Sequence, residues 1–297
     1  MTYHQVMRGR TALPLVLAWV GCKAQVDGGN TTIDGSVDDV IDPADDASVL
    51  GAWGTPAPVG GASDPALQED DGTLTYDGLE IVFARQNAAD NNRKDLYWAS
   101  RMTPQGNFGM PVLLELSAVG SSEETPRFSD DDKTLYFASN LAGNLDIYSI
   151  TRPATGLPFT GTGQPMPGLA SASVEKWFTP CDGGRYLVIL GPDIAEGTLP
   201  NPPTVVAPLS SAESETGTFL TKDCRTTYFA STSGGTNAIY TSTRGAPTDP
   251  WPAPTPVADF AALGGAQSDP WISRDQRTFV LVSNASNNQN DVYISTR

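Results

Sequence analysis

One acidic residue precedes a short apolar run in each of five segments of this 297-residue chain. The five are Asp70, Glu124, Glu175, Glu215 and Asp269. Carboxylates can bind a cation or a basic ligand, and two of them about 5 to 9.5 Å apart can hydrolyse a glycosidic bond. Either kind of chemistry requires the fold to bring these side chains to one place.

Histidine-dependent chemistry is excluded if the N-terminal segment is removed, because His4 is the only histidine of the chain. Ser-His-Asp and Cys-His catalysis and histidine-bound metals all need an imidazole. We therefore expect a mature chain without cofactor or metal, in which the five acids remain the candidate ligand or cation site.

The acids belong to a repeated unit. Without gaps, residues 124–138 (ETPRFSDDDKTLYFA) align with residues 70–84 (DDGTLTYDGLEIVFA). Further copies begin at Thr216 and Ser268, and a weaker copy spans residues 174–190. Four units then end in a second apolar run such as DIYSITR, whereas the third unit has residues 191–206 in its place. Short runs rich in aromatic and β-branched residues, separated by Gly, Pro, Asn and Asp, are typical of an all-β protein.

A Pro-rich run precedes each unit, as at Trp53 (WGTPAPV). Proline cannot donate to a strand ladder, so these runs should be outermost strands. Units of about 50 residues with four short strands predict propeller blades, because a lone four-stranded sheet has two faces to cover. We predict a five-bladed β-propeller of four-stranded antiparallel blades over residues 51–297. The strand near Trp53 should join the last blade, which ends at Arg297 without an outer strand.

The pattern E-x-P-x-F-S-x-D-x-x-x-L-Y-F-A-S … D-I-Y in Glu124 to Tyr148 resembles the WD40-like repeat of TolB-type β-propellers. The resemblance covers nearly all of residues 51–297, best in the second and fifth units and least in the third. It implies a blade rather than an activity. It also implies an extracytoplasmic binding or scaffold protein, since TolB-type propellers have been associated with cell-envelope lipoprotein partners.

Residues 1–21 have the form of a secretory signal peptide. Arg8 and Arg10 precede an apolar stretch that is too short to cross a bilayer. The sequence AWVGC, which ends at Cys22, resembles a bacterial lipobox, although Trp19 stands where an aliphatic residue is usual. This resemblance implies lipidation of Cys22. An ordinary signal peptide followed by a chance cysteine is the alternative.

Residues 22–50 are predicted to be an acidic disordered tether. Residues 23–50 contain seven Asp and one Lys, and they cannot bury enough apolar surface to offset the entropy of ordering. A calcium loop is the alternative, but the Asp spacing does not match an EF-hand. Lys23 follows the cysteine, where Asp would suggest retention in the inner membrane in lipoproteins of this kind. We expect an exported protein that is lipid-anchored to the outer membrane, on its periplasmic or surface side.

The loops between the second and third strands of each unit are rich in Asn and Gly, and they should open on the same face as the acids. They are residues 86–94, 140–144, 232–237 and 284–290, and we call this side the loop face. Polar loops on a rigid scaffold often bind partners, although solvated loops look the same. The insert at residues 191–203 should overhang this face. On the opposite face, Cys181 and Cys224 fall in corresponding turns of adjacent units, so we predict a disulfide.

Two functions remain. A non-enzymatic lipoprotein would bind an envelope protein, a peptide or a glycan through the loop face, and a glycoside hydrolase would use a carboxylate pair at the tunnel mouth. The near-equivalence of the five acids favours binding, because a catalytic pair needs unlike environments. A structural role, in which the acids cap turns and hold blades in register, is the alternative for these residues. With 34 acidic and 18 basic residues, the chain should repel nucleic acid and anionic membranes, so membrane contact would come through the lipid anchor alone. We expect a monomer.

Overall fold

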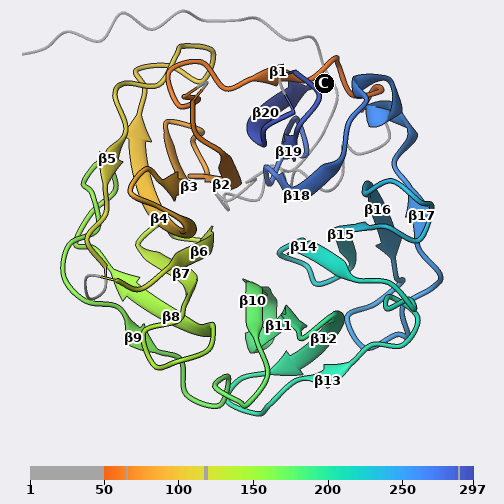
Figure 1. Cartoon of the computed structure of the whole chain (residues 1–297). Coiled ribbons are helices and arrows are strands. Elements are labelled where there is room, and N and C mark those ends of the chain that lie inside the picture. The colour runs from red at the N-terminus through yellow and green to blue at the C-terminus, as the bar shows by residue number, and fades with distance from the viewer. Residues whose placement is uncertain (1–49, 65, 117–119, 287) are drawn as a thin grey trace, which may run out of the picture. The chain divides into compact units, whose positions relative to one another are not determined.

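The computed structural model describes residues 50–64, 66–116, 120–286 and 288–297. The predicted signal peptide, Cys22 and all but the last residue of the predicted tether lie outside the described residues. Residues 51–297 form five four-stranded antiparallel sheets arranged in a ring (Figure 1), so the predicted five-bladed β-propeller is confirmed. Within the described ranges, no helix is long and apolar enough to cross a membrane.

Each blade runs from an inner strand at the tunnel to a two-residue outer strand at the rim. Blade 1 contains β2 (Glu69–Leu74), β3 (Glu80–Asn87), β4 (Asp90–Ser100) and β5 (Val112–Leu113). Blade 2 contains β6 (Glu123–Phe128), β7 (Thr134–Ser139), β8 (Asp146–Thr151) and β9 (Gln164–Pro165). Blade 3 contains β10 (Glu175–Pro180), β11 (Arg185–Leu190), β12 (Asp193–Thr198) and β13 (Thr204–Val205). Blade 4 contains β14 (Glu215–Leu220), β15 (Thr226–Ser231), β16 (Ala238–Thr243) and β17 (Thr255–Pro256). Blade 5 contains β18 (Gln267–Ile272), β19 (Thr278–Ser283), β20 (Asp291–Thr296) and, from the start of the propeller, β1 (Ala57–Pro58).

The second strand of every blade supplies the core. These strands are apolar on both faces because each blade packs between two neighbours. In blade 1, for example, Phe83 belongs to a core cluster with Val280 of blade 5, whereas Val82 belongs to a core cluster with Leu135 of blade 2. The continuous apolar runs that the repeats share are therefore explained by burial on two sides.

The ring closes as the sequence predicts. Ala57 pairs with Ile294 and Pro58 pairs with Tyr293, so the first strand of the propeller is the outer strand of the last blade. The guanidinium of Arg297 lies 4.0 Å from the centre of the Trp53 ring. Both ends of the propeller thus contribute to one sheet, and no blade is left without its outer strand.

The same arginine contact recurs in four blades. An arginine directly after the third strand donates to a carbonyl of the turn between the first two strands, and it also lies over an aromatic ring of the Pro-rich run. The pairs are Arg101 with Phe108, Arg152 with Phe159, Arg244 with Trp251, and Arg297 with Trp53. The closing motif of the repeats and the aromatic residues of the Pro-rich runs therefore form one structural unit.

Blade 3 departs from this pattern, and one prediction about it was wrong. Residues 191–203 do not overhang the loop face: Gly191 and Pro192 form a tight turn, and β12 is the regular third strand of the blade. Leu199 replaces the arginine, and only residues 199–203 connect β12 to β13. The segment was misjudged because DIAEGT lacks the Tyr of the other third strands and is not followed by their arginine.

Candidate functional site

The five predicted acids lie near the loop-face end of the inner strands, but they occupy three different register positions. Glu175 and Glu215 are the first residues of their strands, equivalent to Glu69 and Glu123. Asp70 and Glu124 are second residues, and Asp269 is a third residue, equivalent to Asp71. The acids therefore do not form one ring.

The first-position glutamates are buried among the connections between blades. Glu215 accepts hydrogen bonds from the hydroxyls of Ser211 (2.6 Å) and Ser231 (3.2 Å). Glu175 accepts one from the Ser171 hydroxyl and lies beside Asp146, which begins the third strand of the preceding blade. Burial and Asp146 raise the pKa of Glu175 to about 7, while Ser171 opposes the rise. These contacts fit the structural alternative, in which acids hold neighbouring blades in register.

The second-position acids are paired with lysines. Asp70 lies 2.7 Å from Lys94 Nζ and accepts a hydrogen bond from Asn290 Nδ2, also at 2.7 Å. Glu124 lies 2.7 Å from Lys176 Nζ. Burial alone would raise the pKa of Glu124, but Lys176 and Lys94 outweigh it and hold that pKa below its usual value. The lowered pKa keeps Glu124 in the charged form, and Asp70 is paired with its own lysine.

The third-position acids lie deepest in the tunnel. Asp71 and Asp269 are 1% and 4% exposed, and their side chains hydrogen-bond to each other. Asp71 also accepts a hydrogen bond from Trp177 Nε1 (2.6 Å) and one from the backbone of Thr125 (3.2 Å). Burial, followed by the mutual repulsion of these carboxylates, raises the pKa of Asp269 far above its usual value. A proton held between the two carboxyl groups accounts for both the raised pKa of Asp269 and their mutual hydrogen bond.

A buried arginine completes this group. Arg127 is 1% exposed and donates to the carbonyls of Pro126 (3.0 Å) and Pro270 (3.3 Å). Its charge faces Asp71 and Asp269. We define the tunnel cluster as the four carboxyl groups, their three cations and one indole: Asp70, Asp71, Glu124, Asp269, Lys94, Lys176, Arg127 and Trp177. With one proton between Asp71 and Asp269, the four carboxyl groups carry three negative charges, which balance the three cations of the cluster.

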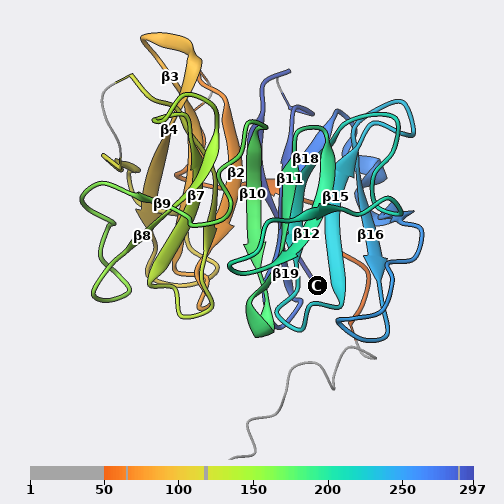
Figure 2. The same cartoon turned by 90° about the horizontal axis from the view of Figure 1, so that it is seen from below.

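The sequence did not reveal the basic members of the tunnel cluster. Lys176 could have been found, because it stands at the register position that holds an acid in blades 1 and 2. Lys94 gave no signal, since it lies in a segment expected to be a loop. In the structure β3 and β4 extend through most of that segment, and only Ala88 and Ala89 separate the two strands. The resulting hairpin projects from the loop face beyond the neighbouring blades (Figure 2).

The other mouth of the tunnel is bridged by side chains from turns between first and second strands. Asp130 of blade 2 lies 2.8 Å from Arg274 of blade 5 and 3.4 Å from Lys222 of blade 4. Arg274 also lies 5.0 Å from the ring centre of Tyr76 in blade 1. Because blade 2 neighbours neither blade 4 nor blade 5, these contacts cross the mouth. The turns of blades 3 and 4 are joined by a Cys181–Cys224 disulfide, with the two Cα atoms 5.4 Å apart.

The cluster does not have the composition of a metal site. Over the part of the chain that the structure describes, no group of three or more histidine, cysteine or acidic side chains could hold a metal ion.

Comparison with known proteins gives similarity of structure only. No protein-family model matches the sequence, and no curated protein matches it. An endo-arabinase from Bacteroides thetaiotaomicron is 12% identical, with a TM-score of 0.55 over 82% of this chain and 97% of that one. A family 117 glycoside hydrolase from Zobellia galactanivorans is 11% identical, with a TM-score of 0.55 over 82% and 89%. A putative TolB from Agrobacterium tumefaciens is 16% identical, with a TM-score of 0.49 over 73% and 70%.

The shared feature is the propeller. Identities this low carry similarity of fold and not of activity. Similarity of fold does not decide between binding and hydrolysis, so that choice depends on the site.

Proposed function

We propose that this chain is a non-enzymatic, exported lipoprotein whose propeller binds an envelope protein, a peptide or a glycan through the loop face. The observation that carries the proposal is the internal pairing of the tunnel cluster. Asp70 and Glu124 are held by lysines, and Asp71 is bonded to Asp269 and Trp177. No carboxyl of the cluster is left to act on a substrate.

The loop face offers a suitable binding surface. The β3–β4 hairpin projects from it, and the exposed loop at residues 140–144 lies on the same side of the ring. The strands below are buried and their hydrogen-bond ladders are continuous, so the loop tips are presented by a rigid base. Such an arrangement allows recognition without any chemical step.

Site-specific photo-crosslinking tests this proposal. A benzophenone side chain at Ala142, on the loop face, should capture a partner in intact cells. The matched position is Gln105, an exposed residue in the β4–β5 loop of the opposite face. Crosslinks from Gln105 with none from Ala142 would overturn the use of the loop face.

Glycoside hydrolysis is the second candidate. The raised pKa values of Asp71 and Asp269 favour it, because a protonated carboxyl beside a carboxylate is what acid–base catalysis requires. Against it, hydrolases hold their two carboxyl groups about 5 to 9.5 Å apart, whereas this pair is in hydrogen-bond contact and buried. Release of sugars from a panel of oligosaccharides, abolished by Asp71→Asn, would establish the hydrolase and refute the non-enzymatic proposal.

The membrane anchor is a separate part of the proposal. Cells that express the full chain should incorporate labelled palmitate into the protein, and Cys22→Ser should abolish the label. Cys181→Ser serves as the control, since a disulfide cysteine takes no lipid. Labelling that persists in Cys22→Ser would contradict lipidation at this residue.

A further inference from the structure

A pocket of about 620 Å³ lies at the rim between blades 3 and 4, away from the tunnel cluster. We call it the rim pocket. Its walls are the ends of β11 and β12, the outer strand β13 with the segment that follows it, and the loop between β16 and β17. This volume is in the range of small-molecule sites.

The pocket borders the irregular part of blade 3. In blades 1, 2 and 4, a connection of eleven or twelve residues covers the corner between the third and outer strands, and an arginine stacked on an aromatic ring fills it. In blade 3 the connection has only residues 199–203, and Leu199 takes the place of the arginine. Asn201 and Pro202 of this short connection line the rim pocket.

A carboxylate lies at the inner wall of the pocket and is already neutralised. Glu196 accepts two hydrogen bonds from Arg244, at 2.7 and 3.1 Å, and one from Trp251 Nε1 at 3.0 Å. Arg244 is 2% exposed and belongs to the blade 4 version of the repeated arginine contact. The pair of Glu196 and Arg244 is therefore part of the contact between blades 3 and 4.

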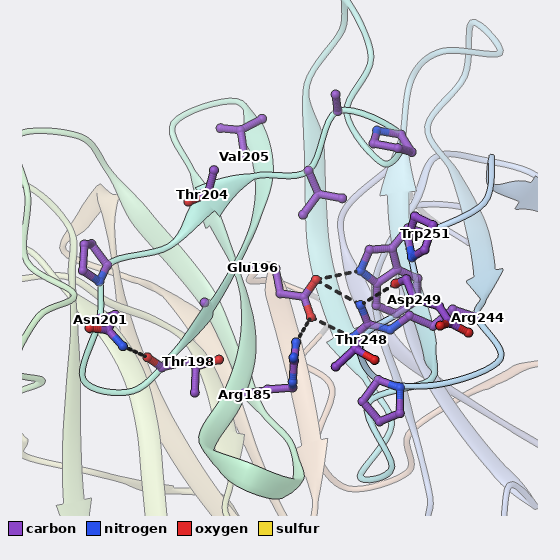
Figure 3. A pocket seen from close by; sticks show the side chains of 17 residues that line it. Arg185, Glu196, Thr198, Asn201, Thr204, Val205, Arg244, Thr248, Asp249 and Trp251 are labelled. Carbon is purple, nitrogen blue, oxygen red and sulfur yellow. Dashed lines mark hydrogen bonds and ion pairs between the residues drawn. The ribbon is translucent and has the colours of Figure 1, made fainter.

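Arg185 is the second cation and is less fully engaged. Among the residues that the structure describes, its side chain makes one hydrogen bond, from Nη1 to Glu196 at 3.3 Å, and it is 29% exposed. Figure 3 shows Arg185 below Glu196, whereas Arg244 and Trp251 lie to the right of that carboxylate. A guanidinium has five N–H donors, so most of those of Arg185 are available to a ligand.

We propose that the rim pocket binds a ligand through a carboxylate group, with Arg185 as the cation that receives it. Guanidinium and carboxylate match in a planar, two-bond geometry. The hydroxyls of Thr198 and Thr204 and the amide of Asn201 line the same pocket and can bond polar groups beside that carboxylate.

The lining distinguishes a carboxylate from other ligand types. Asp249, an exposed residue of the lining, and Glu196 would repel a doubly charged phosphate more than a singly charged carboxylate. A neutral sugar would lack a stacking platform, because Arg244 covers the Trp251 ring at 4.0 Å. This binding site lies apart from the loop face, so the proposal does not depend on the function proposed above.

Calorimetric titration of the mature chain tests the site with two acids and their neutral counterparts. The probes are galacturonate, which carries a single carboxylate, and its methyl ester, and the tripeptide Ala-Ala-Ala and its C-terminal amide. At least one acid should bind tenfold or more tightly than its neutral counterpart, and the tighter acid identifies whether a glycan or a peptide supplies the carboxylate. Equal binding of acid and neutral forms, or no binding of either acid at millimolar concentration, would overturn the proposal.

Variants then assign the cation. Arg185→Gln should weaken binding of the acid tenfold or more and leave the melting temperature nearly unchanged, because the side chain is partly exposed. Lys133→Gln removes an exposed positive charge in blade 2 and should change affinity less than twofold. An Arg185→Gln protein that binds the acid like the wild type would refute the assignment.

Discussion

Glu175 and Asp146 meet at the boundary between blades 2 and 3, where both side chains are buried. Glu175 Oε2 and Asp146 Oδ1 are each without a conventional donor. Below its raised pKa of about 7, the Glu175 carboxyl holds a proton that can supply one through its hydrogen bond to Asp146. At the scale of single residues, such a shared proton thus helps to hold blades together.

Glu175→Gln should reduce the pH dependence of stability. The pKa of Glu175 is about 7 in the folded chain and about 4.5 when exposed, so between these values the folded state holds more protons. The wild type should therefore lose on the order of 1–3 kcal/mol of unfolding free energy as pH rises from about 4.5 to 7, with no further loss above that. Urea unfolding at pH 5 and pH 8 measures this change. Glu213→Gln, which alters an exposed glutamate, should retain the wild-type dependence. An equally steep dependence in Glu175→Gln would contradict the shared proton.

The inner strands share a feature at the scale of the element: each contains a β-bulge. The residue at the bulge has a positive φ in every blade, and the five are Asp71 (60°), Thr125 (54°), Trp177 (52°), Gly217 (63°) and Asp269 (52°). The bulges lie side by side around the tunnel, and hydrogen bonds link neighbouring ones, as from Thr125 to Asp71 and from Trp177 to Thr125. They aim the tunnel cluster toward the axis of the ring.

Gly217→Ala should destabilise the propeller strongly. Four other blades tolerate a side chain at this left-handed position, so the conformation alone is not the obstacle. The obstacle is space, since a Cβ on Gly217 would lie 2.6 Å from the backbone of Asp269. We expect a loss of at least about 2 kcal/mol in urea unfolding.

Gly191→Ala is the matched control for this substitution. Gly191 has the same φ of 63°, but nothing lies within 4 Å of the added Cβ. Its loss should stay near 1 kcal/mol, which is the cost of the left-handed conformation alone. If both variants lost the same amount, crowding between blades 4 and 5 would not be the cause.

Strands, repeats and ring closure could be predicted because they follow from local patterns of apolar residues, prolines and turns. The bulges could not, because Asp, Thr, Trp and Gly at equivalent positions share no property that a sequence pattern detects. The pairing of Asp70 with Lys94 also escaped prediction, since it depends on how far the β3–β4 hairpin extends. Blade 3 shows the same limit: its third strand forms from backbone pairing with β11, although its side chains depart from the repeat.

At the scale of the whole molecule, adjacent blades are held by contacts that do not repeat. Glu80 of blade 1 receives Arg152 of blade 2, whereas Glu196, at a different strand position in blade 3, receives Arg244 of blade 4. Blades 3 and 4 are also joined by the disulfide. The ring therefore combines a repeated core with individual connections.

Loss of the disulfide should weaken the ring without unfolding it. The crosslink joins residues 43 apart in sequence, for which the gain in stability is typically about 2–4 kcal/mol. The double variant Cys181→Ser and Cys224→Ser should lose this amount relative to the oxidised wild type. Reductant should lower the stability of the wild type and leave the double variant unchanged. Insensitivity of the wild type to reductant would contradict a stabilising crosslink.

Closure of the ring is tested by Trp53→Ala, with Trp251→Ala as its counterpart in an uninterrupted blade. Both indoles are nearly buried, and each lies 4.0 Å from an arginine, so both variants should lose about 3–5 kcal/mol. The two variants should differ in which strands show increased hydrogen exchange. Trp53 fixes a strand that pairs with the end of the chain, so hydrogen exchange should increase in β1, β18, β19 and β20. In Trp251→Ala the increase should be confined to blades 3 and 4, whose core that ring joins. Unchanged exchange in blade 5 of Trp53→Ala would mean that the shared sheet does not hold the ring closed.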